Sequence, residues 1–208
     1  KGKHPSALLP VSVGHELAGV VIETGPAVTK LGIGDRVTVE PVIACGTCDP
    51  CRRGQYHLCR NISFQYRKGQ GAFAPYFTAH EDHVFHLPEG LSYEEGALVE
   101  PLSVALHAVK KSGVRLGNTS AVFGAGAIGL LVTMLLRQAS GGKTFIVDVH
   151  DFRLQMGLEL GAHRAIHNRR ENALEVIFAE TGGAGVDFSY EAVGMEMTLV
   201  QALQSLRK

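Results

Sequence analysis

The sequence has no excess of charge of either sign and no long apolar run, and each absence excludes a class of protein. Its 208 residues carry 20 basic and 20 acidic side chains, so the formal net charge is zero. A binder of nucleic acid or of an anionic membrane usually has a clear positive surplus. No apolar run reaches the roughly 18 residues that span a bilayer. The chain starts at Lys1 without an initiator methionine or a signal peptide. We therefore expect a cytoplasmic globular protein with neither nucleic acid nor membrane as a partner.

Cysteine is scarce, and all of it lies in the segment 45–59. Disulfides in secreted scaffolds are usually spread through the chain, so this crowding favours a metal site in a reducing compartment. Four thiolates satisfy one tetrahedral zinc ion and leave no open position for a substrate, which predicts a structural zinc. A zinc ribbon that binds nucleic acid is the rival interpretation, but the loop offers few basic residues for it. The spacing is C-x2-C-x2-C-x7-C, with Cys45, Cys48, Cys51 and Cys59 as the ligands.

The two halves of the sequence differ in pattern. Residues 1–97 contain short β-branched runs such as "GVVIET" and "DRVTVEP", bounded by turn residues. From residue 98 a helical segment leads into alternating strands and helices, which favours a parallel sheet with crossover helices. We predict an α/β protein with a β-rich domain over 1–97. A linking helix and a doubly wound domain over 98–208 follow, and four strands are visible there where a full sheet of this type has about six.

A glycine-rich turn, "VFGAGAIG", follows the first strand of the second half and opens a helix. Gly124, Gly126 and Gly129 form the pattern G-x-G-x-x-G, and Asp148 lies about 20 residues further on. This context is typical of a turn that binds a dinucleotide, with the pyrophosphate at the helix N-terminus. Asp148 can accept hydrogen bonds from a ribose diol and repels a 2′-phosphate, which favours NAD over NADP. Arg153 could stack near the adenine or instead bind a 2′-phosphate. The alternative is a glycine turn without a ligand.

Several motifs together resemble the zinc-dependent medium-chain dehydrogenases. They are "GHELAGVVIETGPAVTKLGIGDRV", the cysteine spacing, "EGALVEPLSVALHAV" and "VFGAGAIGLL". The nearest branch is the polyol dehydrogenases of the sorbitol type, with butanediol dehydrogenases close by. The resemblance implies a partial GroES-like catalytic domain followed by a partial Rossmann domain. It also implies catalytic and structural zinc, NAD as cofactor, and hydride transfer from a secondary alcohol such as a polyol. Members of the family form dimers or tetramers, which implies a homo-oligomer.

The resemblance also implies roles for individual residues. His15 in "GHE" corresponds to a ligand of the catalytic zinc, and Glu16 is a second ligand or lies very close to it. Glu100 in "VEPL" stands where classical alcohol dehydrogenases have a cysteine ligand, and the resemblance implies that it reaches the catalytic zinc directly or through a water on the zinc. Taken alone, His15 could be a satisfied histidine in a turn, and Glu100 could merely stabilise a helix start. The cofactor-binding residues are Gly124, Gly126, Ala127, Ile128, Gly129, Asp148 and Arg153.

The sequence departs from the family pattern in one important respect. No cysteine precedes His15 to act as the usual third ligand, and the usual proton-relay hydroxyl is also absent. We therefore expect an internal fragment of a longer enzyme, inactive by itself and holding one tight zinc in the cysteine loop. A short, non-catalytic NAD-binding paralogue is the alternative. The other histidines carry no predicted ligand role: His80, His83 and His86 are expected at the surface, and His107 in the core.

Overall fold

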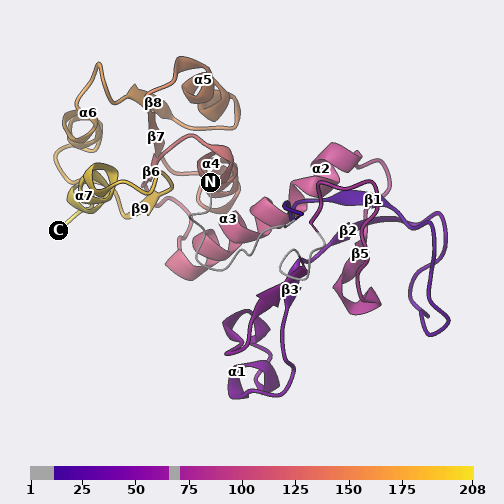
Figure 1. Ribbon diagram of the computed structural model, residues 1–208. Helices are drawn as coiled ribbons and strands as arrows, with labels where there is room; N and C mark the ends of the chain where they lie inside the picture. Colours follow the sequence, from indigo (N-terminus) through magenta and orange to yellow (C-terminus); the bar gives the residue numbers. More distant parts are fainter. Residues whose placement is uncertain (1–11, 66–70) are drawn as a thin grey trace. The chain divides into compact units, whose positions relative to one another are not determined.

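The computed structural model describes residues 12–65 and 71–208, and the chain divides into two compact units (Figure 1). The first unit is Lys1–Glu100 and the second is Pro101–Lys208. None of the helices in the described part of the chain is long and apolar enough to cross a membrane.

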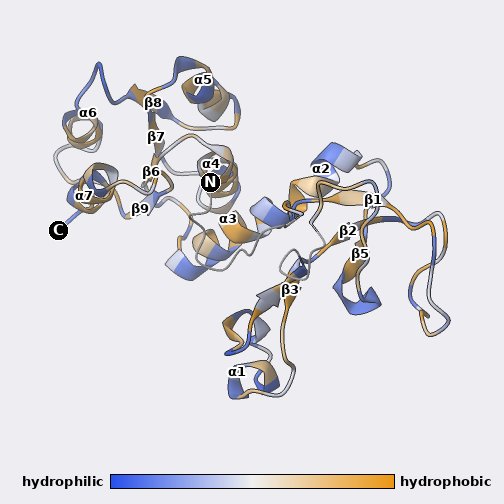
Figure 2. Cartoon of the chain, viewed as in Figure 1, coloured by the Kyte–Doolittle hydropathy of each residue, from blue (hydrophilic) through white to orange (hydrophobic). Residues whose placement is uncertain are grey.

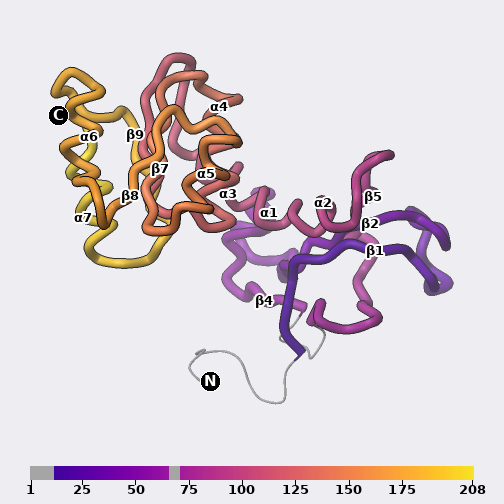
Figure 3. The backbone as a smooth tube through the Cα atoms, turned by 90° about the horizontal axis from the view of Figure 1, so that it is seen from above, coloured from indigo at the N-terminus to yellow at the C-terminus, as the bar shows by residue number. Residues whose placement is uncertain are grey.

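The first unit is organised around a three-stranded antiparallel sheet in the order β1-β2-β5, whose strands lie side by side in Figures 1 and 3. The central strand, "RVTV", is rich in β-branched residues, which suit a pleated and half-buried surface, and it buries Val37 and Val39. A two-stranded pair, β3-β4, closes the segment that contains the cysteines. The strands are β1 Ala18–Val20, β2 Arg36–Val39, β3 Val42–Ile43, β4 Ser63–Phe64 and β5 Val84–His86. The helical turns are α1 Asp49–Arg52, η1 Tyr56–Leu58, η3 Glu81–His83 and α2 Tyr93–Ala97.

Helix α3 (Val99–Ser112) begins directly after α2, and its first turn carries a residue of the predicted site. A capping box between Ser92 and Glu95 starts α2. Because the first turn of a helix has N–H groups without helical partners, Pro101 is tolerated near the start of α3. These local signals fix Glu100 in that first turn.

The second unit is a four-stranded parallel sheet in the order β8-β7-β6-β9, with helices on both faces, as Figure 1 shows. Alternating residues of the central strands enter different cores: Phe123 packs with residues of α6 and α7, and Val122 packs with residues of α3 and α4. Figure 2 shows the hydrophobic colour on β7 and β8, which lie between the helices of the two faces, and the hydrophilic colour on much of α5. The strands are β6 Ser120–Phe123, β7 Thr144–Asp148, β8 Arg164–His167 and β9 Phe188–Glu191. The helices are α4 Ala127–Ala139, α5 Asp151–Glu159, α6 Ala173–Glu180 and α7 Glu196–Gln204.

All four strands are parallel, but the order in which the chain adds them to the sheet changes side between β6 and β9. The chain moves outward from β6 to β7 and β8, then crosses back so that β9 pairs on the other side of β6. In sheets of this kind ligands bind outside the carboxyl ends of the strands at the point of reversal. The glycine turn follows β6 and therefore lies at that point. The predicted α/β class, with an antiparallel region before a parallel sheet, is confirmed.

Candidate functional site

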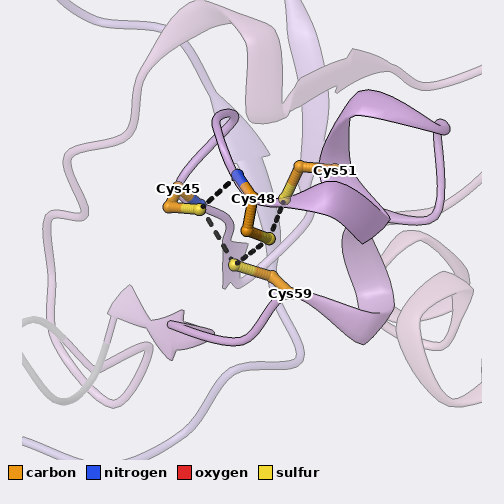
Figure 4. A group of neighbouring side chains, drawn as sticks. All are labelled: Cys45, Cys48, Cys51 and Cys59. Atoms are coloured by element: carbon orange, nitrogen blue, oxygen red, sulfur yellow. Dashed lines mark hydrogen bonds between the residues drawn. The ribbon is translucent and has the colours of Figure 1, made fainter.

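The four cysteine side chains converge on one point from three short structural segments (Figure 4). All four are free thiols, and their sulfur atoms lie within 4.8 Å of one another. The sulfur of Cys48 is 3.4 Å from that of Cys51 and 3.9 Å from that of Cys59. A tetrahedral zinc ion with bonds of about 2.3 Å separates its sulfur ligands by about 3.8 Å, so the cluster fits such an ion.

Backbone N–H groups stabilise negative charge on these sulfur atoms. The amide of Cys48 donates to the Cys45 sulfur at 3.4 Å, and the amide of Asn61 donates to the Cys59 sulfur at 3.3 Å. The Cys48 amide and its neighbours lower the pKa of Cys45 to about 5. Burial and the adjacent sulfur atoms raise the pKa of Cys51 to about 12. A divalent cation would shift this balance, since it binds thiolates and releases their protons.

A second group of possible ligands brings together two distant parts of the first unit. Gly14, with a φ of 94°, adopts a conformation that favours glycine and turns the chain just before His15. Its carbonyl accepts a hydrogen bond from the Ala72 amide at 2.9 Å, and the Val13 carbonyl accepts one from the Phe73 amide at 3.0 Å. The segment before His15 is therefore held against residues 71–73.

Helix α3 supplies the other end of this second group. The ligand atoms of His15, Glu16 and Glu100 all lie within 4.8 Å of one another. His15 and Glu100 are half-buried, and Glu16 is exposed. Burial raises the pKa of Glu100, the charge of Glu16 raises it further, and His15 acts in the opposite direction. One imidazole and two carboxylates form a nitrogen and oxygen donor set that zinc accepts.

The three glycines of the turn after β6 have different surroundings. Gly124 has a φ of 101°, and a Cβ there would lie 2.8 Å from the Val193 side chain. Gly126 precedes α4, and a Cβ there would meet nothing within 4 Å. A Cβ at Gly129 would lie 1.8 Å from the carbonyl oxygen of Gly124, so helix and strand pack too closely for any side chain. Ala127 and Ile128 form the first turn of α4, whose N–H groups have no partner within the helix and can bind an anion.

Asp148, the last residue of β7, ties the glycine turn to the neighbouring strand. Its Oδ2 atom accepts a hydrogen bond from the Ala125 amide at 2.7 Å. Its Oδ1 atom accepts from the amides of Val149 and His150 at 2.7 and 3.0 Å and lies 2.9 Å from His150 Nδ1. Burial opposes ionisation, but these donors hold the pKa of Asp148 below its usual value. Asp148, which the sequence predicts to bind the ribose, thus also stabilises the glycine turn through Ala125, and the motif alone did not indicate this contact.

The other residues for which the sequence makes a prediction are Arg153 and four histidines. Arg153 lies in α5 with its guanidinium carbon 5.6 Å from the centre of the Phe152 ring. His80 and His86 are exposed and His83 is half-buried. The expectation that His107 belongs to the core is wrong, because it is exposed on α3. Buried Ala105 and Val109 define the inner face of that helix, and a residue two positions from either lies on the opposite side.

Comparison with known proteins agrees with both units. Residues 1–89 match the model of the alcohol dehydrogenase GroES-like domain, and residues 127–208 match that of the zinc-binding dehydrogenases. Over 200 residues the chain is 38% identical to sorbitol dehydrogenase of Bacillus subtilis, covering 96% of this chain and 57% of that protein.

Two solved structures have the same fold. One is 2R,3R-butanediol dehydrogenase of Bacillus subtilis, with a TM-score of 0.84 and 39% identity over 97% of this chain and 57% of that chain. The other is a candidate zinc-binding dehydrogenase of Sinorhizobium meliloti 1021 bound to NADP, with a TM-score of 0.93 and 33% identity over 99% of this chain and 60% of that chain. The chain therefore spans little more than half the length of the relatives it matches.

A GroES-like region followed by a parallel sheet with a glycine turn defines the class as an alcohol dehydrogenase fold. The chain belongs to the zinc-dependent medium-chain dehydrogenases and resembles the sorbitol dehydrogenases among them. The family and the GroES-like and Rossmann parts predicted from the motifs are confirmed.

Gly129 and Gly126 differ in the space around them, which predicts different effects of an alanine substitution on stability. Gly129→Ala should destabilise the second unit by about 1–3 kcal/mol, because its methyl group must displace α4 from β6. Gly126→Ala, three residues away in the same turn, should leave the free energy of unfolding nearly unchanged, since space is open around it. Urea denaturation followed by circular dichroism measures both. Equal stability of the two variants would contradict the close packing of α4 on β6.

Proposed function

We propose that the protein is a zinc-dependent oxidoreductase that transfers a hydride from a secondary alcohol to NAD, with a polyol such as sorbitol as the substrate. The observation that carries this proposal is the convergence of His15, Glu16 and Glu100, whose ligand atoms lie within 4.8 Å of one another. The same chain carries a G-x-G-x-x-G turn at the reversal point of a parallel sheet. An active site needs both parts, a metal centre for the alcohol and a dinucleotide site for the hydride acceptor.

His15, Glu16 and Glu100 would hold the catalytic zinc ion. When bound, zinc supplies a positive charge that lowers the pKa of a coordinated hydroxyl group. Glu100 is half-buried and burial raises its pKa, so a bound cation would offset the cost of burying its negative charge. Two carboxylates make this a harder and more polar centre than one with thiolates, in keeping with a polyhydroxylated substrate.

The dinucleotide site is supported by the turn after β6. The open space at Gly126 lets a pyrophosphate approach the backbone, and the N–H groups of Ala127 and Ile128 can bind it. NAD supplies the carbon that accepts the hydride. Asp148 Oδ2 accepts one amide hydrogen bond, and its second lone pair can accept a ribose hydroxyl. Arg153 borders the same edge of the sheet and would contact the adenosine half.

A butanediol dehydrogenase is the second candidate, because the chain is 39% identical to one solved enzyme of that activity and 38% identical to a sorbitol dehydrogenase. The two carboxylates at the proposed metal site favour the polyol. A non-catalytic NAD-binding paralogue is the alternative outside the enzymes. We further propose domains over 1–97 and 98–208, a homo-oligomer in the complete protein and a cytoplasmic location.

The decisive experiment uses the complete protein that contains this chain, since the relatives are longer. NADH formation from sorbitol and from 2,3-butanediol gives kcat/KM for each substrate. We expect sorbitol to be preferred, and His15→Ala or Glu100→Gln to lower kcat/KM at least ~10²-fold through loss of metal-dependent chemistry.

His107→Ala is the control, because His107 is exposed and lies on the same helix as Glu100. The 208-residue chain assayed alone should show no dehydrogenase activity. Full turnover by the His15→Ala variant would refute the metal site, and a preference for butanediol would establish the second candidate.

The cysteine cluster should bind one zinc ion with a local structural role. Cys48→Ser should remove one zinc per chain and lower thermal stability, because α1 and η1 bury no residue of their own and depend on the metal for order. The turnover of correctly folded molecules should change little, since a four-thiolate site has no open position. Thr47→Val is the control: it removes the Thr47 hydroxyl, which lies 3.6 Å from the Cys45 sulfur, and keeps all four ligands. A Cys48→Ser protein of normal stability that loses only turnover would contradict this role.

Asp148 should favour NAD over NADP. Asp148→Asn removes the charge that repels a 2′-phosphate, and we expect the ratio of kcat/KM for NAD to that for NADP to fall about tenfold. The variant should also lose about 1–3 kcal/mol of stability, because an amide cannot accept from both Ala125 and the amides after β7. Asp151→Asn is the control, because it also replaces a carboxylate by an amide, but this carboxylate pairs with Arg170 and not with the glycine turn. It should leave the cofactor ratio unchanged. A parent enzyme that already prefers NADP would mean that Arg153 outweighs Asp148.

A further inference from the structure

Strand β9 ends at Glu191, whose carboxylate accepts hydrogen bonds from the backbone amides that follow the strand. Glu191 Oε1 accepts hydrogen bonds from the amides of Val193 and Gly194 at 2.9 and 3.0 Å, and Oε2 accepts from Gly194 at 3.2 Å. The hydroxyl of Thr198, in α7, lies 2.8 Å from Oε1. Burial alone would raise the pKa of Glu191, but these donors hold it below its usual value. One side chain therefore accepts hydrogen bonds from two amides of the turn 192–195.

This carboxylate takes the place of an ordinary helix cap. Helix α7 begins after Met195, which makes no side-chain capping bond, and Gly194 has a φ of 80°. A negative charge next to the first turn of a helix is favourable, because the N–H groups there are unpaired. Glu191 supplies that charge from the preceding strand.

The turn held by Glu191 lies against the glycine turn at the reversal point of the sheet. Glu191 is the register partner of Phe123, the residue before Gly124. The Ala192 amide donates to the Phe123 carbonyl at 2.8 Å. A Cβ at Gly124 would lie 2.8 Å from the Val193 side chain and 3.0 Å from the Ala192 backbone. The turn 192–195 thus borders the glycine turn at Gly124 on the β9 side. Asp148 contacts the glycine turn at Ala125 from the β7 side.

We propose that Glu191 is a positioning residue for the dinucleotide site, which it serves by holding Val193 against Gly124. This inference rests on the proposed function in so far as the glycine turn binds NAD. Asp148 on the β7 side would serve the adenosine half of the proposed cofactor, whereas the turn 192–195 contacts Gly124 from the β9 side. Glu191 therefore acts on the pyrophosphate and nicotinamide half and leaves the adenosine half alone.

The chain offers a matched control at the opposite end of the same strand. Asp187, just before β9, accepts from the Thr119 amide at 2.8 Å and pairs with Arg207 at 2.6 Å. It ties β9 to the residue before β6, at the edge of the sheet away from the glycine turn. Asp187→Ala removes a hydrogen-bonded carboxylate from this strand, as Glu191→Ala does, without touching the turn 192–195.

The test measures binding of NAD⁺ and of 5′-AMP to the complete protein by titration calorimetry. Glu191→Ala should weaken NAD⁺ binding about tenfold and 5′-AMP binding less than about twofold, because AMP engages only the adenosine side. Glu191→Gln keeps one carbonyl oxygen as acceptor and should restore NAD⁺ affinity to within about threefold of the parent. Asp187→Ala should leave both affinities unchanged even if it lowers stability. Unchanged NAD⁺ affinity in Glu191→Ala, or an equal loss for NAD⁺ and AMP, overturns the proposal.

A second measurement separates this inference from the proposed function. Hydrogen exchange of the amides of Gly124 and Ala125, which donate to Val147 and Asp148, needs no bound nucleotide, and it should accelerate in Glu191→Ala but not in Asp187→Ala. If the parent protein binds no NAD⁺, the cofactor part of the proposed function fails, and this exchange still decides whether Glu191 orders the glycine turn. Equal exchange of these two amides in the parent and in Glu191→Ala overturns the positioning role.

Discussion

The second unit depends on how closely helix α4 approaches strand β6. A side chain at Gly129 would overlap the carbonyl oxygen of Gly124, so the two elements meet through backbone alone. That approach sets the start of α4 immediately after the strand and aims its unpaired N–H groups at the carboxyl edge of the sheet. The strands on either side then add further contacts, among them those from Asp148 to Ala125 and from the turn 192–195 to Gly124. The proposed cofactor site is the product of three strands meeting at one glycine turn.

The first unit reaches its proposed chemistry by a different route. Its described sheet has three short strands, and the residues of the second ligand group lie outside them, in a glycine turn and in the first turn of α3. The cysteine loop has almost no apolar interior, since α1 and η1 contain no buried residue. Here side chains with metal-binding groups, rather than an extensive core, define the local structure.

The sequence predicts placement well where the signal is local: the four cysteines do come together, and the glycine turn does lie before α4. The cysteine spacing and the glycine pattern each lie within a few residues, and the geometry of a turn or of a metal determines both. The family likeness indicated that His15 and Glu100 belong together, but no pattern in the sequence contains the contact of residues 13–14 with 72–73 that holds the segment before His15. The bond from Ala125 to Asp148 and the hydrogen bonds to Glu191 were missed for the same reason. The expectation for His107 was wrong because Ala105 and Val109 mark the buried face of α3, and a residue two positions from either lies on the opposite side.

Asp148 has a structural role and, in the proposed function, a role in cofactor preference. This combination limits how the cofactor preference of the protein can change during evolution. One carboxylate holds the glycine turn through Ala125 and, in the proposed function, also discriminates between cofactors. A lineage that exchanged this residue to accept a phosphorylated nucleotide would loosen its own binding turn in the same step. Another group near Ala125 must then replace the lost hydrogen bond. A change of cofactor preference therefore requires at least two coupled substitutions.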